Sequence, residues 1–455
     1  MGALPKALVK LGHKVTVYLP LYRTMRSHQM PLAAENIHVP FSYGPRFCAV
    51  RNAGLNDDVQ HYAIEHDHFF DRTSIYGFRD DAERFYLLSR AAMEATRYLG
   101  KADLLHVHDW HTSLVPVLLR TQYVHDPHFA RTPCMLTIHN MGYQGVCDES
   151  ILPMLTLPWE LFTPHGLEFH GGANLLKGGI VFADFVTAVS PRYAYEIQTR
   201  EGGFELDLTV RTRSSTVRGI LNGVDYSEWD PASDPHIKAH YTSNDLSGKS
   251  ACKRDLLDAF GLPGADLQYP ILGIVSRFAE QKGLDLIGHI AHRLAQDPVR
   301  IITLGSGDPD LEEMFRNLSW QYPGRFANRI AYDNSLAHKI EAGADMFLMP
   351  SRYEPCGLNQ IYSLRYGTVP IVRAVGGLDD SIQQYNPADG SGTGFKFQNF
   401  DAGEFYDAIS TSMHFYGHTD HWQRIQRNGM AMDYSWERSA REYIQIYEQL
   451  VRSRS

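Results

Sequence analysis

The sequence predicts an α/β protein with two doubly wound domains, in which helices cover parallel sheets. Short apolar runs bounded by Gly, Pro, Asp or Asn alternate with longer amphipathic segments along almost all 455 residues, as is typical of parallel sheets. At roughly 100–200 residues per domain, the length suggests two or three domains. A similar phrase, an Ala-Asp pair and an apolar run ending at Ser, occurs at 183–190 and 344–351. It indicates two related domains, although two common helix-to-strand joints would read the same way.

The apolar runs define the expected strands, and the amphipathic segments define the expected helices. We predict strands at 104–108, 135–138, 185–189, 271–275, 300–304, 346–349 and 369–372. We predict helices at 80–99, 191–199, 284–295, 311–320 and 402–416. Asp-Pro and Pro-Gly pairs crowd together between 230 and 268, so the domain boundary is expected there. The predicted N-terminal domain covers 1–235, a linker with a short helix covers 236–264, and the C-terminal domain covers 265–433.

The composition excludes several classes of function. The chain has 43 Lys and Arg against 52 Asp and Glu, a net charge of −9, which argues against a nucleic-acid partner because phosphate binding needs a cationic face. The apolar stretches are too short to span a bilayer and no charged-then-apolar leader opens the chain, so neither a membrane partner nor secretion is expected. Five cysteines without a C-x-x-C pair predict no disulfide framework and no zinc site, which fits a reducing cytoplasm.

Polar and glycine-rich clusters lie just past the ends of the predicted strands. They occupy 108–111, 139–140, 222–225, 276–282, 305–308, 351–354 and 376–377. In open α/β sheets, ligands bind outside the carboxyl ends of the strands. We therefore expect a functional cleft between the two domains, with both sets of clusters facing it.

Two cations and two glycine loops in the C-terminal half are suited to a diphosphate. Arg277 and Lys282 follow a predicted strand and together can neutralise a leaving diphosphate in a transition state; a solvated surface pair is the alternative. Gly376 and Gly377 precede a predicted helix, where free N–H groups favour a phosphate. Gly305 begins a second loop of this kind, and either loop can also be a plain turn.

Glu354 opens a segment that is suited to sugar hydroxyls. Pro355 is favoured in a first helical turn, so a helix is predicted from there to about residue 366. The amides of the next three residues would then lie beside the Glu354 carboxylate, and these residues are Cys356, Gly357 and Leu358. The alternative is an acid that only complements the helix dipole.

Histidines and aromatic residues supply further candidates in the N-terminal half. His139 follows a predicted strand, but a histidine at such a place is often a hydrogen-bonded structural residue. The histidines at 106, 108 and 111 are not expected to bind metal, because two of them lie on a strand. Three aromatic residues can stack on sugars or bases, or can belong to the core: Trp110, Tyr143 and Tyr332.

Eight stretches follow one another in a familiar order over nearly the whole chain. They are GALPKALVKLGHKVTVYLP (2–20), HVHDWH (106–111), TIHNMGYQG (137–145), LKGGIVFADFVTAVSP (176–191), GILNGVD (219–225), SRFAEQKGLDL (276–286), PSRYEPCGLNQIYSLRYGTVPIVRAVGGL (350–378) and YSWERSAREY (434–443). In this order and spacing, they resemble the bacterial glycogen synthases and plant starch synthases. The resemblance implies the GT-B fold, two Rossmann-like domains around a cleft, with a last helix at 434–455 packed back on the N-terminal domain.

The resemblance also implies an activity. The family transfers glucose, with retention of configuration, from ADP-glucose, or from UDP-glucose in some members, to the non-reducing end of α-1,4-glucan such as glycogen. It uses no catalytic metal or other cofactor. Arg277 and Lys282 resemble the pair that neutralises the diphosphate, Glu354 the acid on the donor glucose, and His139 the histidine near the reacting carbon. The remaining carried-over residues are Asn222, Gly305, Tyr332, Cys356, Gly357, Leu358, Gly376 and Gly377 for the donor, and Asp109 and His108 for the acceptor side.

Two departures from the family pattern bear on the activity. Many related transferases carry a second Glu eight residues after the first; here Tyr362 stands there, with Gln360 nearby, as in the glycogen-synthase branch. Family members also have a strand and a Lys-x-Gly-Gly-Leu loop before the GALPKAL helix, in which this chain begins. Without that lysine, activity is expected to fall by about 10²–10³. A non-catalytic glucan- or nucleotide-binding protein and another GT-B transferase remain the alternatives.

Overall fold

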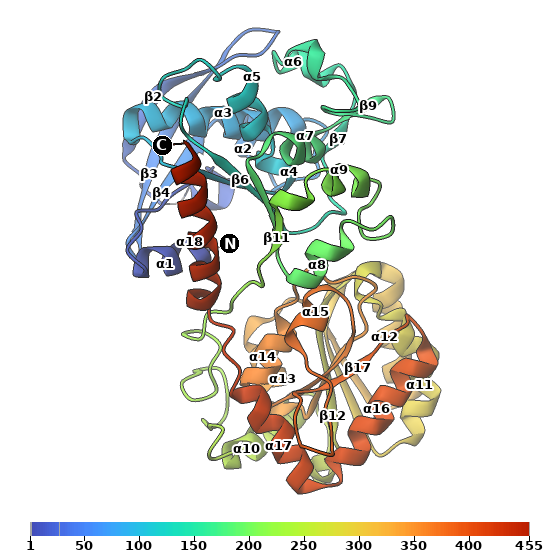
Figure 1. Cartoon of the computed structure of the whole chain (residues 1–455). Coiled ribbons are helices and arrows are strands. Elements are labelled where there is room, and N and C mark those ends of the chain that lie inside the picture. The colour runs from blue at the N-terminus through green and yellow to red at the C-terminus, as the bar shows by residue number, and fades with distance from the viewer. Residues whose placement is uncertain (1, 27, 455) are drawn as a thin grey trace. The chain divides into compact units, whose positions relative to one another are not determined.

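The computed structural model describes residues 2–26 and 28–454. The chain divides into two compact units (Figure 1). Unit 1 consists of Met1–Val189, Ala194–Ile220 and Trp436–Ser455, and unit 2 consists of Ser190–Tyr193 and Leu221–Ser435. The boundaries expected from the sequence at 235 and 264 stay a prediction.

Unit 2 is built on a six-stranded parallel sheet with the order β14-β13-β12-β15-β16-β17. Its strands are β12 (Ile271–Phe278), β13 (Arg300–Gly307), β14 (Phe326–Ile330), β15 (Met346–Met349), β16 (Val369–Arg373) and β17 (Phe395–Phe397). The four strands predicted in this half of the sequence are confirmed. The chain runs outward from β12 through β13 to β14 and then returns to β15 on the other side of β12. The strand order therefore reverses between β12 and β15, which is where such sheets bind ligands.

Helices cover both faces of the unit 2 sheet (Figure 1). One face packs against α11 (Asp285–Gln296), α12 (Pro309–Gln321), α16 (Ala402–Tyr416) and α17 (Thr419–Met430). The other packs against α10 (Ser247–Ala259), α13 (Asn334–Gly343), α14 (Asn359–Arg365) and α15 (Gly376–Ser381). Neighbouring strand residues alternate between the two cores: Leu272 joins the first and Ile271 the second. Burial on both faces explains why these strands read as continuous apolar runs.

Unit 1 contains a parallel sheet and a mixed sheet. The parallel sheet has the order β11-β10-β6-β5, with β5 (Leu105–His108), β6 (Cys134–Ile138), β10 (Phe185–Ala188) and β11 (Val217–Gly219). The mixed sheet has the order β1-β4-β3-β2, with β1 (Thr16–Pro20), β2 (Leu32–Val39), β3 (Arg46–Asn56) and β4 (Val59–Glu65). The three strands predicted in this half are confirmed as β5, β6 and β10.

The antiparallel part of unit 1 departs from the sequence prediction of parallel sheets alone. β3 pairs antiparallel with both β2 and β4, and only β1 pairs parallel, with β4. The strand β2 carries the burial pattern of a strand with one exposed side, and register shifts interrupt its pairing with β3. Such strands lack the long apolar runs of a sheet buried on both faces. This is why the sequence pattern did not reveal them.

Helices of unit 1 complete its core and shape its surface. The elements of unit 1 include α1 (Ala3–Lys10), α3 (Asp81–Leu99), α4 (Asp109–Thr112), α5 (Leu114–Thr121), α7 (Leu175–Phe182), α9 (Asp207–Arg211) and α18 (Trp436–Arg454). Leu4 and Leu8 of α1 share a hydrophobic cluster with Tyr443 and Ile446 of α18, so the two ends of the chain pack together (Figure 1).

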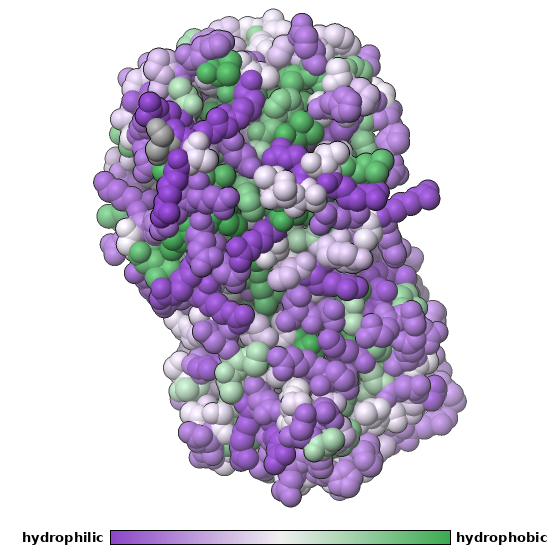
Figure 2. All heavy atoms as spheres, viewed as in Figure 1, coloured by the Kyte–Doolittle hydropathy of each residue, from purple (hydrophilic) through white to green (hydrophobic). Residues whose placement is uncertain are grey.

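The surface of each unit is largely hydrophilic on the face shown in Figure 2, with hydrophobic residues in small groups. Across residues 2–26 and 28–454, no helix has the length and apolar character needed to cross a lipid bilayer.

Candidate functional site

A pocket of about 200 Å³ opens at the carboxyl ends of β12 and β15, where the strand order of unit 2 reverses. We call it the unit 2 pocket. It is lined by Val275, Ser276, Arg277, Lys282, Leu284, Leu348, Met349, Pro350, Ser351, Gly357, Leu358 and Asn359. Four residues predicted from the sequence are therefore brought together here: Arg277 from the end of β12, Lys282 from the segment after it, and Gly357 and Leu358 from the segment after β15.

Lys282 and Glu354 form an ion pair at this pocket, with 2.6 Å between Nζ and Oε2. Lys282 ends the short turn η5 (Glu280–Lys282), and Glu354 lies just beyond β15. Their side chains are 19% and 6% exposed. Ser351 Oγ donates a second hydrogen bond to the same carboxylate oxygen, at 3.2 Å. Arg277 is exposed and lines the same pocket, so the site combines two cations with one buried carboxylate.

Residues 354–358 form a loop, and the helix predicted to start at Pro355 begins four residues later, with Asn359. Gly357 has φ 69°, a left-handed conformation that ends any helix passing through it. The loop is locked against the start of α15, because Gly377 N donates to Glu354 O at 3.0 Å. A Cβ atom at Gly377 would lie 2.0 Å from Cys356 O. Only glycine therefore fits at 377.

The loop presents its backbone to the unit 2 pocket. Gly357 and Leu358 both line it, and their N–H groups donate to no other residue in the described part of the chain. Burial raises the pKa of the Cys356 thiol to about 12, so the thiol stays protonated and Cys356 contributes through its backbone. Free amides beside cations are suited to anionic or hydroxyl oxygens.

The other donor-side residues predicted from the sequence lie outside the lining of this pocket. Gly305 is on β13, paired with Ser276 of β12, and its hydrogen leaves room for Ser276 O. Asn222 Oδ1 is buried and finds no hydrogen-bond partner among the described residues. Tyr332 follows β14 and is 91% exposed. Gly376 opens α15, whose first turn holds Gly377.

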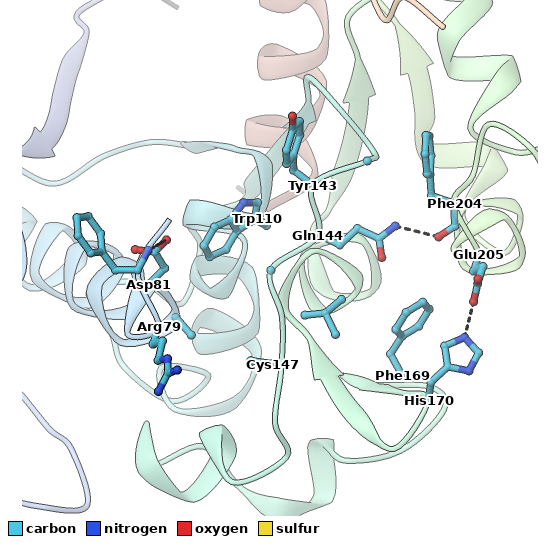
Figure 3. Close-up of a pocket in the computed structure, with 15 residues that line it drawn as sticks. Arg79, Asp81, Trp110, Tyr143, Gln144, Cys147, Phe169, His170, Phe204 and Glu205 are labelled. Atoms are coloured by element: carbon cyan, nitrogen blue, oxygen red, sulfur yellow. Dashed lines mark hydrogen bonds and ion pairs between the residues drawn. The ribbon is translucent and has the colours of Figure 1, made fainter. Parts of the chain in front are cut away.

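Unit 1 contains a larger pocket, of about 700 Å³, which we call the unit 1 pocket (Figure 3). Arg79, Asp81 and Trp110 line one side. The rest of the lining consists of Phe78, Ala82, the segment 142–147, Phe169, His170, Phe204 and Glu205. Gly145 lies against the Trp110 ring, because a Cβ there would sit 2.4 Å from Trp110 Cε3. Aromatic faces with polar groups between them are typical of sites that hold small polar ligands.

The far wall of the unit 1 pocket is held in a conformation that costs backbone strain. Three non-glycine residues there have positive φ: His170 (52°), Phe204 (45°) and Glu205 (68°). Gln144 Nε2 donates to Phe204 O at 2.9 Å, and His170 Nε2 lies 2.5 Å from Glu205 Oε2 (Figure 3). Non-glycine residues in this region cluster at ligand sites, where the surrounding contacts hold them. No sequence motif predicted this wall, because the amino-acid sequence does not show which non-glycine residues have a positive φ.

His139 lies at the carboxyl end of β6, beside two residues predicted with it. Asp109 Oδ1 accepts hydrogen bonds from the backbone N–H of His139 (2.7 Å) and of Asn140 (3.3 Å). His108 Nδ1 lies 3.1 Å from His139 Nε2. Burial lowers the pKa of His139 to about 4 and raises that of Asp109 to about 6. At neutral pH the histidine is therefore neutral, and the carboxylate holds the turn that carries it.

The histidine cluster continues into the core. His106 contacts Tyr447 OH through Nδ1 (2.7 Å) and Thr137 Oγ1 through Nε2 (2.6 Å). Burial lowers the pKa of His106 to about 3. Within the described ranges, no three His, Cys, Asp or Glu side chains come together as metal ligands would.

Two protein families match separate parts of the chain. Residues 1–212 match the family described as starch synthase catalytic domain, and residues 262–429 match glycosyl transferases group 1. The chain is 53% identical to the glycogen synthase of Koribacter versatilis over 460 residues, covering all of this chain and 95% of that protein. It is 42% identical over 463 residues to the glycogen synthase of Pseudothermotoga lettingae, again over all of this chain and 95% of that protein.

Solved structures show the same similarity. The catalytic domain of starch synthase IV from Arabidopsis thaliana, bound to ADP and acarbose, has a TM-score of 0.91 and 33% identity, covering 99% of this chain and 94% of that chain. Sucrose-phosphate synthase from Thermosynechococcus elongatus has a TM-score of 0.60 and 19% identity, over 99% and 92% of the two chains, which is a likeness of fold alone. Both are glycosyltransferases of the GT-B fold, so the predicted fold class is confirmed.

Proposed function

The chain belongs to the glycogen and starch synthase family, and from this premise we propose that it transfers glucose from ADP-glucose to the non-reducing end of an α-1,4-glucan, with retention. The 53% identity to a glycogen synthase over the whole of this chain and the ADP-bound structural relative support a nucleotide-sugar donor and a glucan acceptor. The non-catalytic alternative and a GT-B transferase with another acceptor are not favoured.

The observation that carries the proposal is the partly buried Lys282–Glu354 pair at the unit 2 pocket, with Arg277 and the free amides beside it. Arg277 and Lys282 bring two positive charges to one end of a small pocket, as a diphosphate requires. Glu354 and the N–H groups of Gly357 and Leu358 offer acceptors and donors for glucose hydroxyls. We assign the diphosphate to the cations and the donor glucose to the carboxylate and amides.

The proposed chemistry stabilises a leaving group. As the glucosyl–phosphate bond breaks, negative charge grows on the diphosphate, and Arg277 and Lys282 stabilise that charge in the transition state. The acceptor 4-hydroxyl attacks from the face that the diphosphate leaves, so configuration is retained. The departing phosphate takes the hydroxyl proton, because none of the residues assigned here has the place of a general base at the acceptor.

We assign the acceptor to unit 1. Its pocket has the aromatic and polar lining that a glucan chain needs, and His108 and Asp109 are the other acceptor-side candidates, while we assign His139 to the catalytic site near the reacting carbon. A neutral His139 can share hydrogen bonds with sugar hydroxyls without adding charge near the reacting carbon. We place Tyr332 beside the adenine of the donor. The other residues that we assign to donor binding are Asn222, Gly305, Cys356, Gly376 and Gly377. We place the activity in the cytoplasm, as cysteines without a paired pattern suggest.

The test is transfer from radiolabelled ADP-glucose to glycogen and to maltotriose by the purified chain. UDP-glucose serves as the competing donor, and cellobiose serves as an unrelated acceptor. We expect incorporation with ADP-glucose and α-glucans, and an α-linkage in the product by proton NMR. Incorporation into cellobiose but not into α-glucan would replace the proposed acceptor. Binding of ADP without any transfer would favour the non-catalytic reading.

A further inference from the structure

One buried side chain, that of Gln360, donates hydrogen bonds to two carbonyl groups of the 354–358 loop. Gln360 is 0% exposed and lies in the first turn of α14. Its Nε2 atom lies 3.0 Å from Cys356 O and 3.0 Å from Gly357 O. Reversing the amide would place Oε1 against two carbonyl oxygens, so the hydrogen-bond pattern fixes its orientation.

The same amide ties the loop to α15. Gln360 Nε2 also lies 3.0 Å from Ser381 Oγ, so its two N–H groups are shared among three acceptors, and the Ser381 hydroxyl donates to Gly377 O at 2.5 Å. Ser381 is itself 0% exposed, and its own carbonyl accepts from Tyr434 OH at 2.7 Å. Together with the Gly377 N to Glu354 O bond, these contacts leave the loop little freedom. They lie entirely within unit 2.

The geometry of the peptide bond links the direction of these two carbonyl groups to the direction of the neighbouring N–H groups. In a trans peptide the C=O and the following N–H point in opposite directions. The carbonyl of Cys356 shares its peptide with the N–H of Gly357, and the carbonyl of Gly357 shares its peptide with the N–H of Leu358. Because both carbonyl groups point towards Gln360, both N–H groups point away from it. Gly357 and Leu358 are the two loop residues that line the unit 2 pocket.

We infer that Gln360 is a positioning residue that aims the N–H groups of Gly357 and Leu358 at the donor glucose. The inference rests on the proposed function for the identity of the ligand. Preorganised N–H donors are effective because they need no reorientation when the ligand arrives. Gln360 itself touches no substrate and acts only through the loop.

Gln360→Met tests this inference, because Met keeps the length of the side chain but cannot donate. Gln426→Met is the matched control: Gln426 is also buried in unit 2 and its Nε2 donates to Gly367 O at 2.7 Å, away from the pocket. We expect Gln360→Met to weaken ADP-glucose binding about tenfold, as the loss of a buried hydrogen bond does. The affinity for ADP should change much less. Gln426→Met should lower the melting temperature and leave both affinities unchanged.

Amide hydrogen exchange of the ligand-free protein gives a readout that does not depend on the proposed substrate. The peptide spanning 354–361 should exchange several-fold faster in Gln360→Met than in Gln426→Met. Unchanged exchange there, together with an unchanged ratio of ADP-glucose to ADP affinity, would overturn the inference. Failure of the wild-type chain to bind ADP-glucose would instead overturn the proposed function, while the exchange result would still decide the role of Gln360 in the loop.

Gln360→Glu keeps the inference testable if the Met variant does not fold. A carboxylate cannot donate to Cys356 O or Gly357 O, whereas a protonated carboxyl can donate to one of them. We therefore expect the ADP-glucose affinity of Gln360→Glu, relative to wild type, to recover as the pH is lowered. A ratio that stays constant with pH would show that donation by residue 360 is irrelevant and would overturn the inference.

Discussion

Lys282 Nζ lies 2.6 Å from Glu354 Oε2 at the end of the unit 2 sheet where the strand order reverses, and Glu354 is buried while Lys282 is partly buried. The lysine therefore neutralises the carboxylate that is proposed to contact the donor glucose. This contact uses only one of the three N–H donors of the Lys282 ammonium group. The lysine can hold Glu354 and still offer a hydrogen bond to a diphosphate.

Lys282→Met is expected to damage both stability and transfer. The variant leaves the buried Glu354 with Ser351 as its side-chain partner among the described residues, and leaving a buried carboxylate without its cation costs about 3 kcal/mol. Loss of charge at the leaving diphosphate should lower the transfer rate by about 10²–10³. Urea unfolding and initial rates with ADP-glucose measure the two effects.

Lys339→Met is the control for that variant. Lys339 pairs with Asp255 at 2.9 Å in the same unit, but both side chains are more exposed, at 30% and 22%. An exposed pair contributes about 0–1 kcal/mol, so stability and transfer should change little. Equal rate losses in the two lysine variants would contradict the special role of Lys282.

Asp109 is expected to give the transfer rate an acidic limb near pH 6. Burial raises the pKa of Asp109 to about 6, and the charged carboxylate accepts the N–H groups of His139 and Asn140 more strongly than the neutral acid does. The rate should therefore fall as the pH drops through 6. His139, with a pKa lowered by burial to about 4, stays neutral across that range and cannot cause the change.

Asp109→Asn separates titration from structure. The Asn Oδ1 atom still accepts both backbone hydrogen bonds but does not ionise. Initial rates from pH 5 to 8 should show a lower plateau without the limb near pH 6. A limb of unchanged position in Asp109→Asn would assign it to another group.

Glu341 is expected to make unit 2 less stable as the pH rises towards 8. Burial raises the pKa of Glu341 from 4.5 to about 8, so between these values the folded protein binds a proton that the unfolded chain has lost. Its stabilising contribution is therefore complete below pH 4.5 and is lost as the pH rises through 8, with a slope of up to about 1.4 kcal/mol per pH unit. Glu341→Gln keeps an acceptor for Ser363 Oγ and should flatten this slope. Urea unfolding at several pH values measures it, and an unchanged slope would contradict the assignment.

The sequence predicted the parts of the fold that are buried on both sides and the parts of the site that belong to motifs. The strands β12 to β16 that pack between two helical layers appear as apolar runs, apart from β14. Arg277, Lys282, Gly357 and Leu358 lie together at one end of this sheet, and their roles stay a prediction. The strands β2 to β4 did not stand out, because a half-exposed strand has no continuous apolar run. The Pro355 helix was wrong for a local reason: the left-handed Gly357 overrides the preference of proline for a first turn.

The unit 1 pocket shows most clearly what pattern reasoning misses. Trp110 and Tyr143 were named as possible stacking residues, but Phe169, His170, Phe204 and Glu205 carry no motif, and only the fold places them in the lining. The role of Gln360 was equally hidden, since its contacts with two carbonyls follow from the shape of the loop. Long-range placement and backbone direction were decisive in both cases.

Gly145→Ala is expected to close part of the unit 1 pocket and to weaken glucan binding. The added Cβ would lie 2.4 Å from Trp110 Cε3, and Gly145 has φ 64°, so the ring must move and the backbone is strained. Gly171→Ala is matched for strain, with φ 81°, but its Cβ meets nothing within 4 Å. A left-handed non-glycine residue costs about 1–3 kcal/mol, so both variants should lose comparable stability. Only Gly145→Ala should also lose affinity for maltohexaose, because only it displaces a wall of the pocket. Calorimetric titration with maltohexaose and thermal unfolding measure the two effects. If both variants bind the oligosaccharide as wild type does, the acceptor must lie elsewhere than against Trp110.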